Sequence, residues 1–310
     1  MLLLLLRLLA CLPLSVLHGL GRLAGGLIYA LPGKYRTRLR ANATQAGYPE
    51  AAFARRAARE AGAMILELAY VWLRTPQAVA RVEVDDAADL HEALADPRGI
   101  LFLTPHLGCY DITARWLAQH RAMTVMYRPP RKTYLAPILS TIRNTEGLTA
   151  VPATMQGVRA FVRTLKQGHS IGMLPDQVPN AGDGVWVPFF DRPAFTTTLP
   201  GRLARQTRVP VVMVAGERLP GGRGWRLHHL RLPDPLPESP EEQARLINAA
   251  METLIRRCPQ QYLWSYNRYK QPHKETARHP DGTAPANAHD RPATSEESAT
   301  PRTSGHTPHD

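Results

Sequence analysis

The chain has 310 residues, of which 44% are hydrophobic, and its formal net charge is +12. This length accommodates one large domain or two small ones. A basic chain suits nucleic acid, an anionic membrane or a phosphorylated substrate. The sequence has no aromatic strand signature, helix-turn-helix pattern or lysine tract, which argues against nucleic acid. Its three cysteines are widely spaced and odd in number, which excludes an obvious disulfide framework or zinc motif and fits a reducing compartment.

Residues 1–31 are strongly apolar but are interrupted by Arg7, Pro13 and Arg22. The uncharged stretch between the two arginines is shorter than the roughly 20 residues that a helix needs to cross a bilayer. We expect an uncleaved membrane anchor, inserted either as a tilted hairpin or as a marginal span; a buried core helix is the alternative. The basic segment 34–40 would favour anionic headgroups on the cytoplasmic face.

From residue 51 onward, helical and strand periodicities alternate along the chain. An amphipathic helix is predicted over 51–75, and Ser-Pro-Glu-Glu at 239–242 predicts a capped helix over 240–257. Further helices are predicted at 87–95, 109–119, 133–144, 154–167 and 195–206. Strands are predicted at 100–104, 123–127, 148–151, 170–174, 209–215 and 225–232, with an irregular stretch at 176–194. This order predicts an α/β fold, a layered α/β/α arrangement around a largely parallel sheet with a mixed edge.

Three parts of the chain follow from these patterns. They are an apolar anchor at 1–31, a domain at 32–270 and a tail at 271–310. The tail consists of Pro, Thr, Ser, Ala, His and charged residues with almost no aliphatic side chains. It cannot bury enough apolar area to offset its conformational entropy, so we expect it to be disordered.

A histidine and a carboxylate five residues apart follow the first predicted strand, in Leu-Phe-Leu-Thr-Pro-His-Leu-Gly-Cys-Tyr-Asp at 101–111. His106 can act as a general base towards a hydroxyl, and Asp111 on its far ring nitrogen would fix the tautomer. A turn at Gly108 would bring the two together. The alternative is a structural histidine beside a helix N-cap. Cys109 could be a nucleophile, but a small buried thiol is the simpler interpretation.

Several blocks resemble the late acyltransferases of lipid A biosynthesis, the lauroyl and myristoyl transferases within the wider glycerolipid acyltransferase group. The His-x4-Asp pair is similar to the group's His-x4-Asp/Glu motif, although this family often has Glu at the second position. The other matching blocks are Met-Tyr-Arg-Pro-Pro at 126–130, Ile-Arg-Asn-Thr-Glu-Gly at 142–147, the long block at 173–198, and segments at 209–214 and 261–270. The resemblance covers about residues 1–270.

The resemblance implies catalytic roles for four residues, His106, Asp111, Arg143 and Asp176. Arg143 would contact the oxyanion or clamp a substrate phosphate, and Asp176 ends an apolar strand, where α/β proteins bind ligands. Substrate-binding roles are expected for Arg128, Gln177, Thr196 and Thr197, the threonines because a helix start suits phosphate. No metal and no cofactor is expected, because His106 and Asp111 lack further ligands at metal-binding spacing.

The resemblance thus implies an O-acyltransferase that moves a fatty acyl group from acyl carrier protein to a hydroxyl of a lipid A precursor. His106 would be the base oriented by Asp111. The enzyme would bind membrane lipids at the bacterial inner membrane, with its active site facing the cytoplasm and without a nucleic-acid partner. Two alternatives remain: an acyltransferase for another lipid or glycolipid, and a non-catalytic lipid-binding membrane protein.

Overall fold

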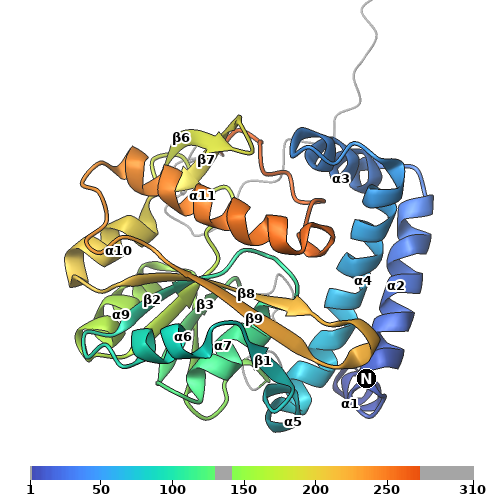
Figure 1. The fold of residues 1–310 in the computed structure, drawn as a ribbon, viewed down its shortest axis with the longest axis horizontal. Helices are drawn as coiled ribbons and strands as arrows, with labels where there is room; N and C mark the ends of the chain where they lie inside the picture. Colours follow the sequence, from blue (N-terminus) through green and yellow to red (C-terminus); the bar gives the residue numbers. More distant parts are fainter. Residues whose placement is uncertain (1, 130–141, 273–310) are drawn as a thin grey trace, which may run out of the picture. The chain divides into compact units, whose positions relative to one another are not determined.

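A computed structural model describes residues 2–129 and 142–272, and a seven-stranded sheet organises them (Figure 1). The strand order is β1-β9-β8-β2-β5-β3-β4. Strands β8, β2, β5, β3 and β4 are parallel, while β9 is antiparallel to β8 and parallel to β1. A separate antiparallel hairpin joins β6 and β7. The bounds are β1 Val82–Val84, β2 Ile100–Leu103, β3 Met123–Tyr127, β4 Leu148–Pro152, β5 Ser170–Met173, β6 Gly184–Phe189, β7 Arg192–Thr197, β8 Val211–Arg218 and β9 Trp225–Arg231.

Helices cover both faces of the sheet because successive strand side chains point to opposite faces. Leu101 and Leu103 join a core formed with α9, α10 and α11, whereas Ile100 and Phe102 join a core formed with α6 and α7. The α/β/α layers and the largely parallel mixed sheet confirm the predicted fold class. The helix bounds are α1 Leu2–Ala10, α2 Leu14–Ala30, α3 Lys34–Gln45, α4 Ala51–Leu73, α5 Thr75–Val79, α6 Ala87–Leu94, α7 Tyr110–Ala118, α9 Met155–Lys166, α10 Leu199–Thr207 and α11 Pro240–Arg257, with short 3-10 turns η2 Pro220–Gly222 and η3 Pro259–Gln261.

The stretch between β5 and α10 differs from the sequence prediction. Residues expected to be irregular form the β6–β7 hairpin, and the helix expected from residue 195 begins at Leu199. Phe190 and Asp191 make the tight turn with left-handed φ values of 47° and 61°. Such hairpin turns normally use Asn or Gly, so the sequence lacked the usual signal. The helix predicted at 133–144 lies mostly outside the described residues, as does the tail from residue 273 onward.

The apolar N-terminal segment forms two helices that meet at Pro13. On its inner side α2 packs closely on α4, since a Cβ added to Gly21 would lie 2.6 Å from the Gly62 carbonyl oxygen. Among the described helices, none has the length and apolar character to cross a bilayer by itself. Only α2 and α3 taken together meet that criterion, and they are bent by 99° at their junction.

A buried group of charged side chains joins α2 and α4 to the β8–β9 edge. Glu67 accepts hydrogen bonds from Arg218 (Nη2–Oε1 2.5 Å) and from Trp225, and its Oε2 lies 3.0 Å from His18 Nε2. Burial alone would raise the pKa of Glu67, but the charges and hydrogen bonds of Arg218 and His18 lower it to about 2. Ionised Glu67 therefore stabilises the fold above its ordinary pKa of 4.5, and this contribution is lost as the pH falls towards 2.

Replacing Arg218 tests how much this buried group contributes. Arg218→Met should lower the free energy of unfolding by about 3–5 kcal/mol, because Glu67 loses its main counter-charge without access to water. The matched control is Arg226→Met, which breaks an exposed pair with Glu83 and should cost at most about 1 kcal/mol. Urea unfolding of both variants measures the difference. Equal losses of unfolding free energy would contradict the stabilising role of the buried Arg218–Glu67 pair.

Candidate active site

His106 and Asp176 meet at the carboxyl edge of the sheet. The register of the parallel strands β2 and β5 pairs Leu103 with Met173, and His106 and Asp176 each follow three residues later. The Nδ1 atom of His106 lies 2.8 Å from Asp176 Oδ1, and the backbone N–H of His106 donates to Asp176 Oδ2 at 2.9 Å. Two contacts to one carboxylate fix both the position and the ring orientation of the histidine.

The second ring nitrogen of His106 is the one available for chemistry. With Nδ1–H donating to Asp176, Nε2 carries a lone pair, and the amide nitrogen of Gln177 lies 3.3 Å from it. Burial alone would raise the pKa of Asp176, but the charge and hydrogen bonds of His106 hold it below the ordinary value. Asp176 is therefore ionised at neutral pH, as a partner for an imidazolium must be.

Asp111 does not touch His106, so the expectation that it orients the histidine was wrong in this geometry. Its Oδ2 accepts hydrogen bonds from Trp72 Nε1 and, at 3.2 Å, from Arg115 Nε. Asp111 lies in the first turn of α7, and its carboxylate is turned towards α4 and its own helix. Asp176, which follows the neighbouring strand β5, has taken the orienting position that spacing along the chain suggested for Asp111.

Arg143 lies close to this group through two tyrosines. Its guanidinium carbon is 4.7 Å from the ring centroid of Tyr127, and its charge acts on the phenol of Tyr110. The Tyr110 ring centroid is in turn 5.0 Å from that of His106. Nη1 of Arg143 is buried without a hydrogen-bond partner among the described residues. The expected role of Arg143, as an oxyanion contact or a phosphate clamp, stays a prediction.

The four expected substrate-binding residues have different surroundings. Gln177 contacts His106, and exposed Arg128 follows β3 at the same sheet edge. We expected Thr196 and Thr197 to offer free N–H groups at a helix start. They instead end strand β7 and do not offer such groups. The buried hydroxyl of Thr196 accepts a hydrogen bond from Arg268 at 2.7 Å. This hydrogen bond joins the hairpin to the C-terminal segment. The helix begins at Leu199, four residues later than the sequence suggested.

The turn between β2 and α7 uses its backbone N–H groups internally. The N–H of Gly108 donates to the carbonyl of Gln261 at 3.1 Å, and that of Cys109 donates to Gly216 at 2.8 Å. Gly108 has a φ of +57°, and a Cβ there would collide with the Gly216 backbone. With the His106 N–H bound to Asp176, the turn is rigid but leaves few main-chain donors for a ligand.

Trp72, Arg115, Tyr110 and Arg268 were missed by sequence reasoning. Only Arg115 had a local signal, because it lies four residues after Asp111 on the same helix face. Tyr110 lies within the His-x4-Asp segment itself, whereas Trp72 and Arg268 reach the site by tertiary packing. Within the described ranges, no group of three or more His, Cys, Asp or Glu side chains is arranged to hold a metal ion.

A histidine held by a buried aspartate at the carboxyl edge of a parallel sheet is typical of α/β enzymes that activate a hydroxyl. The family model described as bacterial lipid A biosynthesis acyltransferase matches residues 1–271. The chain therefore belongs to this family of acyltransferases, as the sequence resemblance indicated.

Three curated relatives illustrate the similarity. The lipid A biosynthesis lauroyltransferase of Escherichia coli (strain K12) is 26% identical over 67% of this chain and 69% of its own length. The myristoyltransferase of the same strain is 29% identical over 67% of this chain and 64% of its own length. A lipid A biosynthesis acyltransferase of Haemophilus influenzae (strain ATCC 51907 / DSM 11121 / KW20 / Rd) is 28% identical, and the match spans 56% of this chain and 55% of that protein.

The thiol of Cys109 is placed for packing rather than for attack. It is fully buried, and burial, with the charges of Glu67 and Asp111, raises its pKa well above the ordinary value. A protonated thiol is a poor nucleophile. The alternative of a Cys109 nucleophile is therefore disfavoured.

Alkylation distinguishes the three cysteines. At pH 8, iodoacetamide should modify exposed Cys11 and spare Cys109 until the protein unfolds. Cys258, whose pKa burial raises to about 12, is an internal control that should also be spared. Peptide mass spectrometry measures the three rates. Modification of native Cys109 as fast as Cys11 would restore the nucleophile interpretation.

Proposed function

We propose that this chain transfers a fatty acyl group from the thioester of acyl carrier protein to a hydroxyl of a lipid A precursor. The observation that carries the proposal is the His106–Asp176 pair, in which the carboxylate holds Nδ1 and leaves Nε2 facing Gln177. An alcohol is a poor nucleophile at neutral pH, so acyl transfer requires a positioned base. An acceptor other than a lipid A precursor would use the same chemistry.

In the proposed reaction, Nε2 of His106 removes the proton from the acceptor hydroxyl as its oxygen attacks the thioester carbonyl. Asp176 stabilises the imidazolium that forms. The tetrahedral intermediate then collapses, the carbon–sulfur bond breaks, and the imidazolium returns the proton to the departing thiolate. An ester and a free thiol result, and neither redox chemistry nor an additional reactant is required.

The oxyanion of the intermediate needs hydrogen-bond donors. Because the N–H groups of His106, Gly108 and Cys109 are already bonded within the protein, we assign this role to a side chain. Arg143 is the strongest candidate, since Nη1 has no partner in the described ranges and its charge reaches Tyr110 beside His106. The Gln177 amide is close enough to His106 to assist.

Asp111 has a positioning role in this proposal. It binds Nε of Arg115, and Nη2 of Arg115 donates to the carbonyl of Ile142 at 2.9 Å. Ile142 directly precedes Arg143. Asp111 thus acts through Arg115 on the backbone that carries Arg143, which gives the second residue of the His-x4-Asp pair a function without contact to the histidine.

An acceptor held in a membrane requires the enzyme to bind there. Exposed leucines cover the outer side of α1 and α2, and the most exposed on α2 and at its end are Leu23 (58%), Leu27 (62%) and Leu31 (66%). A patch of this kind marks an interaction surface. We propose that it enters the outer part of a bilayer, at the cytoplasmic face of the bacterial inner membrane.

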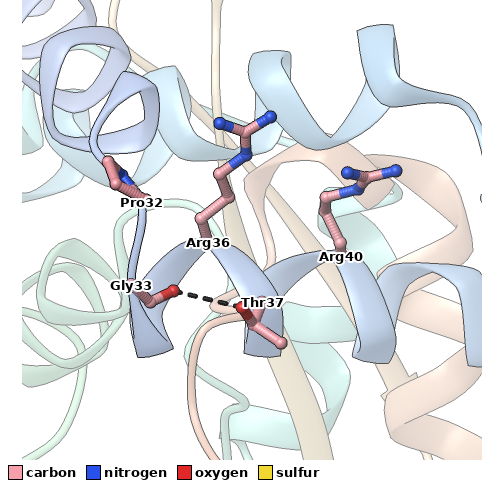
Figure 2. A pocket seen from close by; sticks show the side chains of 5 residues that line it. All are labelled: Pro32, Gly33, Arg36, Thr37 and Arg40. Carbon is pink, nitrogen blue, oxygen red and sulfur yellow. Dashed lines mark hydrogen bonds between the residues drawn. The ribbon is translucent and has the colours of Figure 1, made fainter.

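Basic side chains on α3 follow this apolar surface. Figure 2 shows Arg36 and Arg40 extending from the same side of α3. Together with Pro32, Gly33 and Thr37 they line a hollow of about 410 Å³. The α3 sequence contains no acidic residue. Two arginines one helical turn apart suit the phosphates of anionic lipids, each contributing about 1 kcal/mol near the surface.

Loss of the orienting carboxylate tests the proposed chemistry. Asp176→Asn should reduce acyl transfer by roughly 10²–10⁴-fold, as His106→Ala should, because the base loses its orientation or is absent. Asp191→Asn changes an exposed carboxylate in the hairpin turn and should leave activity unchanged. The assay follows transfer from acyl carrier protein to detergent-dispersed lipid A precursor.

Thermal unfolding would confirm that the Asp176 and His106 variants are folded. Near wild-type transfer by a folded Asp176→Asn protein would refute the mechanism. If the wild-type protein binds lipid but transfers no acyl group, the non-catalytic alternative is correct.

Vesicle flotation tests the membrane surface. Replacing Leu23, Leu27 and Leu31 with Gln should release most of the protein from vesicles, since each loses about 1.5–3 kcal/mol of apolar burial in lipid. Arg36→Gln with Arg40→Gln should weaken flotation only with anionic vesicles, and more at low salt. Met155→Gln, at an exposed methionine on α9, is the control. Undiminished flotation of the leucine variant would show that another surface binds lipid.

A further inference from the structure

A second charged surface lies on α9 and α10, two helices that contact each other and cover the same face of the sheet. Exposed basic residues occur at helical spacing on α9, where Arg159, Arg163 and Lys166 form one stripe, while Phe161 and Leu165 face the core. On α10, Arg202 and Arg205 are exposed beside it. We call these five residues the basic face. Neither helix contains an acidic residue.

The basic face is largely without counter-charge from the protein. Across the described part of the chain, no ion pair involves Arg159, Arg163, Lys166 or Arg205, and Arg202 has one long contact with Asp183 at 3.7 Å. Unpaired cations of one sign on adjacent helices repel each other. A surface of this kind complements an acidic partner, which would gain both attraction and faster association.

The position of the basic face connects it to the proposed reaction. Helix α9 begins three residues after β4, whose carboxyl end lies at the same sheet edge as His106 because β4 is parallel to β3, β5 and β2. Met155, the first residue of α9, is 70% exposed. Methionine and arginine are both enriched at protein interfaces. Helix α9 therefore begins at the sheet edge that carries the site, two strands beyond β5, and the stripe extends away from that edge by about 1.5 Å per residue.

A lipid surface is a poorer match for the basic face. In Figure 1, α9 and α10 lie on the left of the domain, whereas α2, with its exposed leucines, lies on the right. The α9–α10 surface lacks comparable apolar residues apart from Met155. Glu241 and Glu242 at the start of α11 are exposed, and α11 contacts α10, so acidic residues follow on the next helix of this layer.

We propose that the basic face docks the acidic protein that carries the acyl thioester, so that its acyl group reaches His106 from the α9 side. This inference rests on the proposed function, because it assigns the binding surface for the donor of that reaction. The partner is recognised by carboxylates on its surface, and the membrane-bound acceptor approaches separately from the side of α2.

Charge reversal tests the docking surface. In a variant with Arg159→Glu, Arg163→Glu and Arg205→Glu, the KM for acyl carrier protein thioester should rise about tenfold or more, because three favourable charge pairs become repulsive. The kcat should change little. The wild-type KM should rise with salt, and that of the variant should rise less. Acyl-pantetheine, which lacks the protein, should be used equally well by both enzymes.

The control variant carries Arg55→Glu, Arg223→Glu and Arg245→Glu, which makes the same change in net charge at exposed positions on other elements. It should keep the wild-type KM for the carrier-protein donor. A carrier protein with its surface carboxylates neutralised should bind the wild-type enzyme as weakly as the reversed variant binds the normal carrier. All assays use detergent-dispersed acceptor, so that vesicle binding does not enter the result.

The outcomes separate this inference from the function on which it rests. An unchanged KM for the carrier-protein donor, or an equal loss with acyl-pantetheine, would overturn the docking surface. Unchanged KM combined with lost binding to anionic vesicles would reassign the basic face to lipid. If the wild-type enzyme uses neither thioester, the proposed function fails instead, and direct binding of carrier protein to the two variants then decides on the surface.

Discussion

Parallel pairing of β2 with β5 is the constraint on which the site depends. Backbone hydrogen bonds set the register of Leu103 against Met173, and the segments that follow the two strands leave the sheet at the same edge. Each strand places a functional side chain three residues further on, so His106 and Asp176 meet although 70 residues separate them. The bond from the His106 N–H to the same carboxylate adds a main-chain constraint. The orientation of the base is thus a property of the sheet rather than of a flexible loop.

The sequence predicted those parts of the fold that local patterns determine. Strand β3 and helix α11 have their predicted bounds, the latter because Ser239 accepts the hydrogen bond from Glu242 N–H that its motif implies. The β6–β7 hairpin was missed since its turn lacks Gly and Asn. In the site, chain proximity favoured Asp111 as the partner of His106. The actual partner, Asp176, depends on which strands are neighbours, which periodicity does not specify.

The N-terminal helices are attached to the domain in a way that the sequence could not indicate. An apolar segment interrupted by arginines suggested either an anchor or a buried core helix, whereas α2 packs on α4 through glycines on one side and exposes leucines on the other. Arg22, which weakened the span prediction, pairs with Glu60 at 2.6 Å. Glu60 also pairs with Arg218. Arg22, one of the two charges that make the segment a poor membrane span, therefore binds it to the protein, while the outer leucines stay exposed.

The rigid turn after β2 has a consequence for how the family can diversify. Its main-chain N–H groups are hydrogen-bonded to Gln261 and Gly216, and the histidine side chain is hydrogen-bonded to Asp176. Exposed Arg128 follows β3 at the same edge and lies outside this hydrogen-bonded group. A substitution of Arg128 therefore leaves the hydrogen bonds between His106 and Asp176 in place. The fold thus separates positions that hold the His106–Asp176 pair from positions at the same edge that can change without moving it.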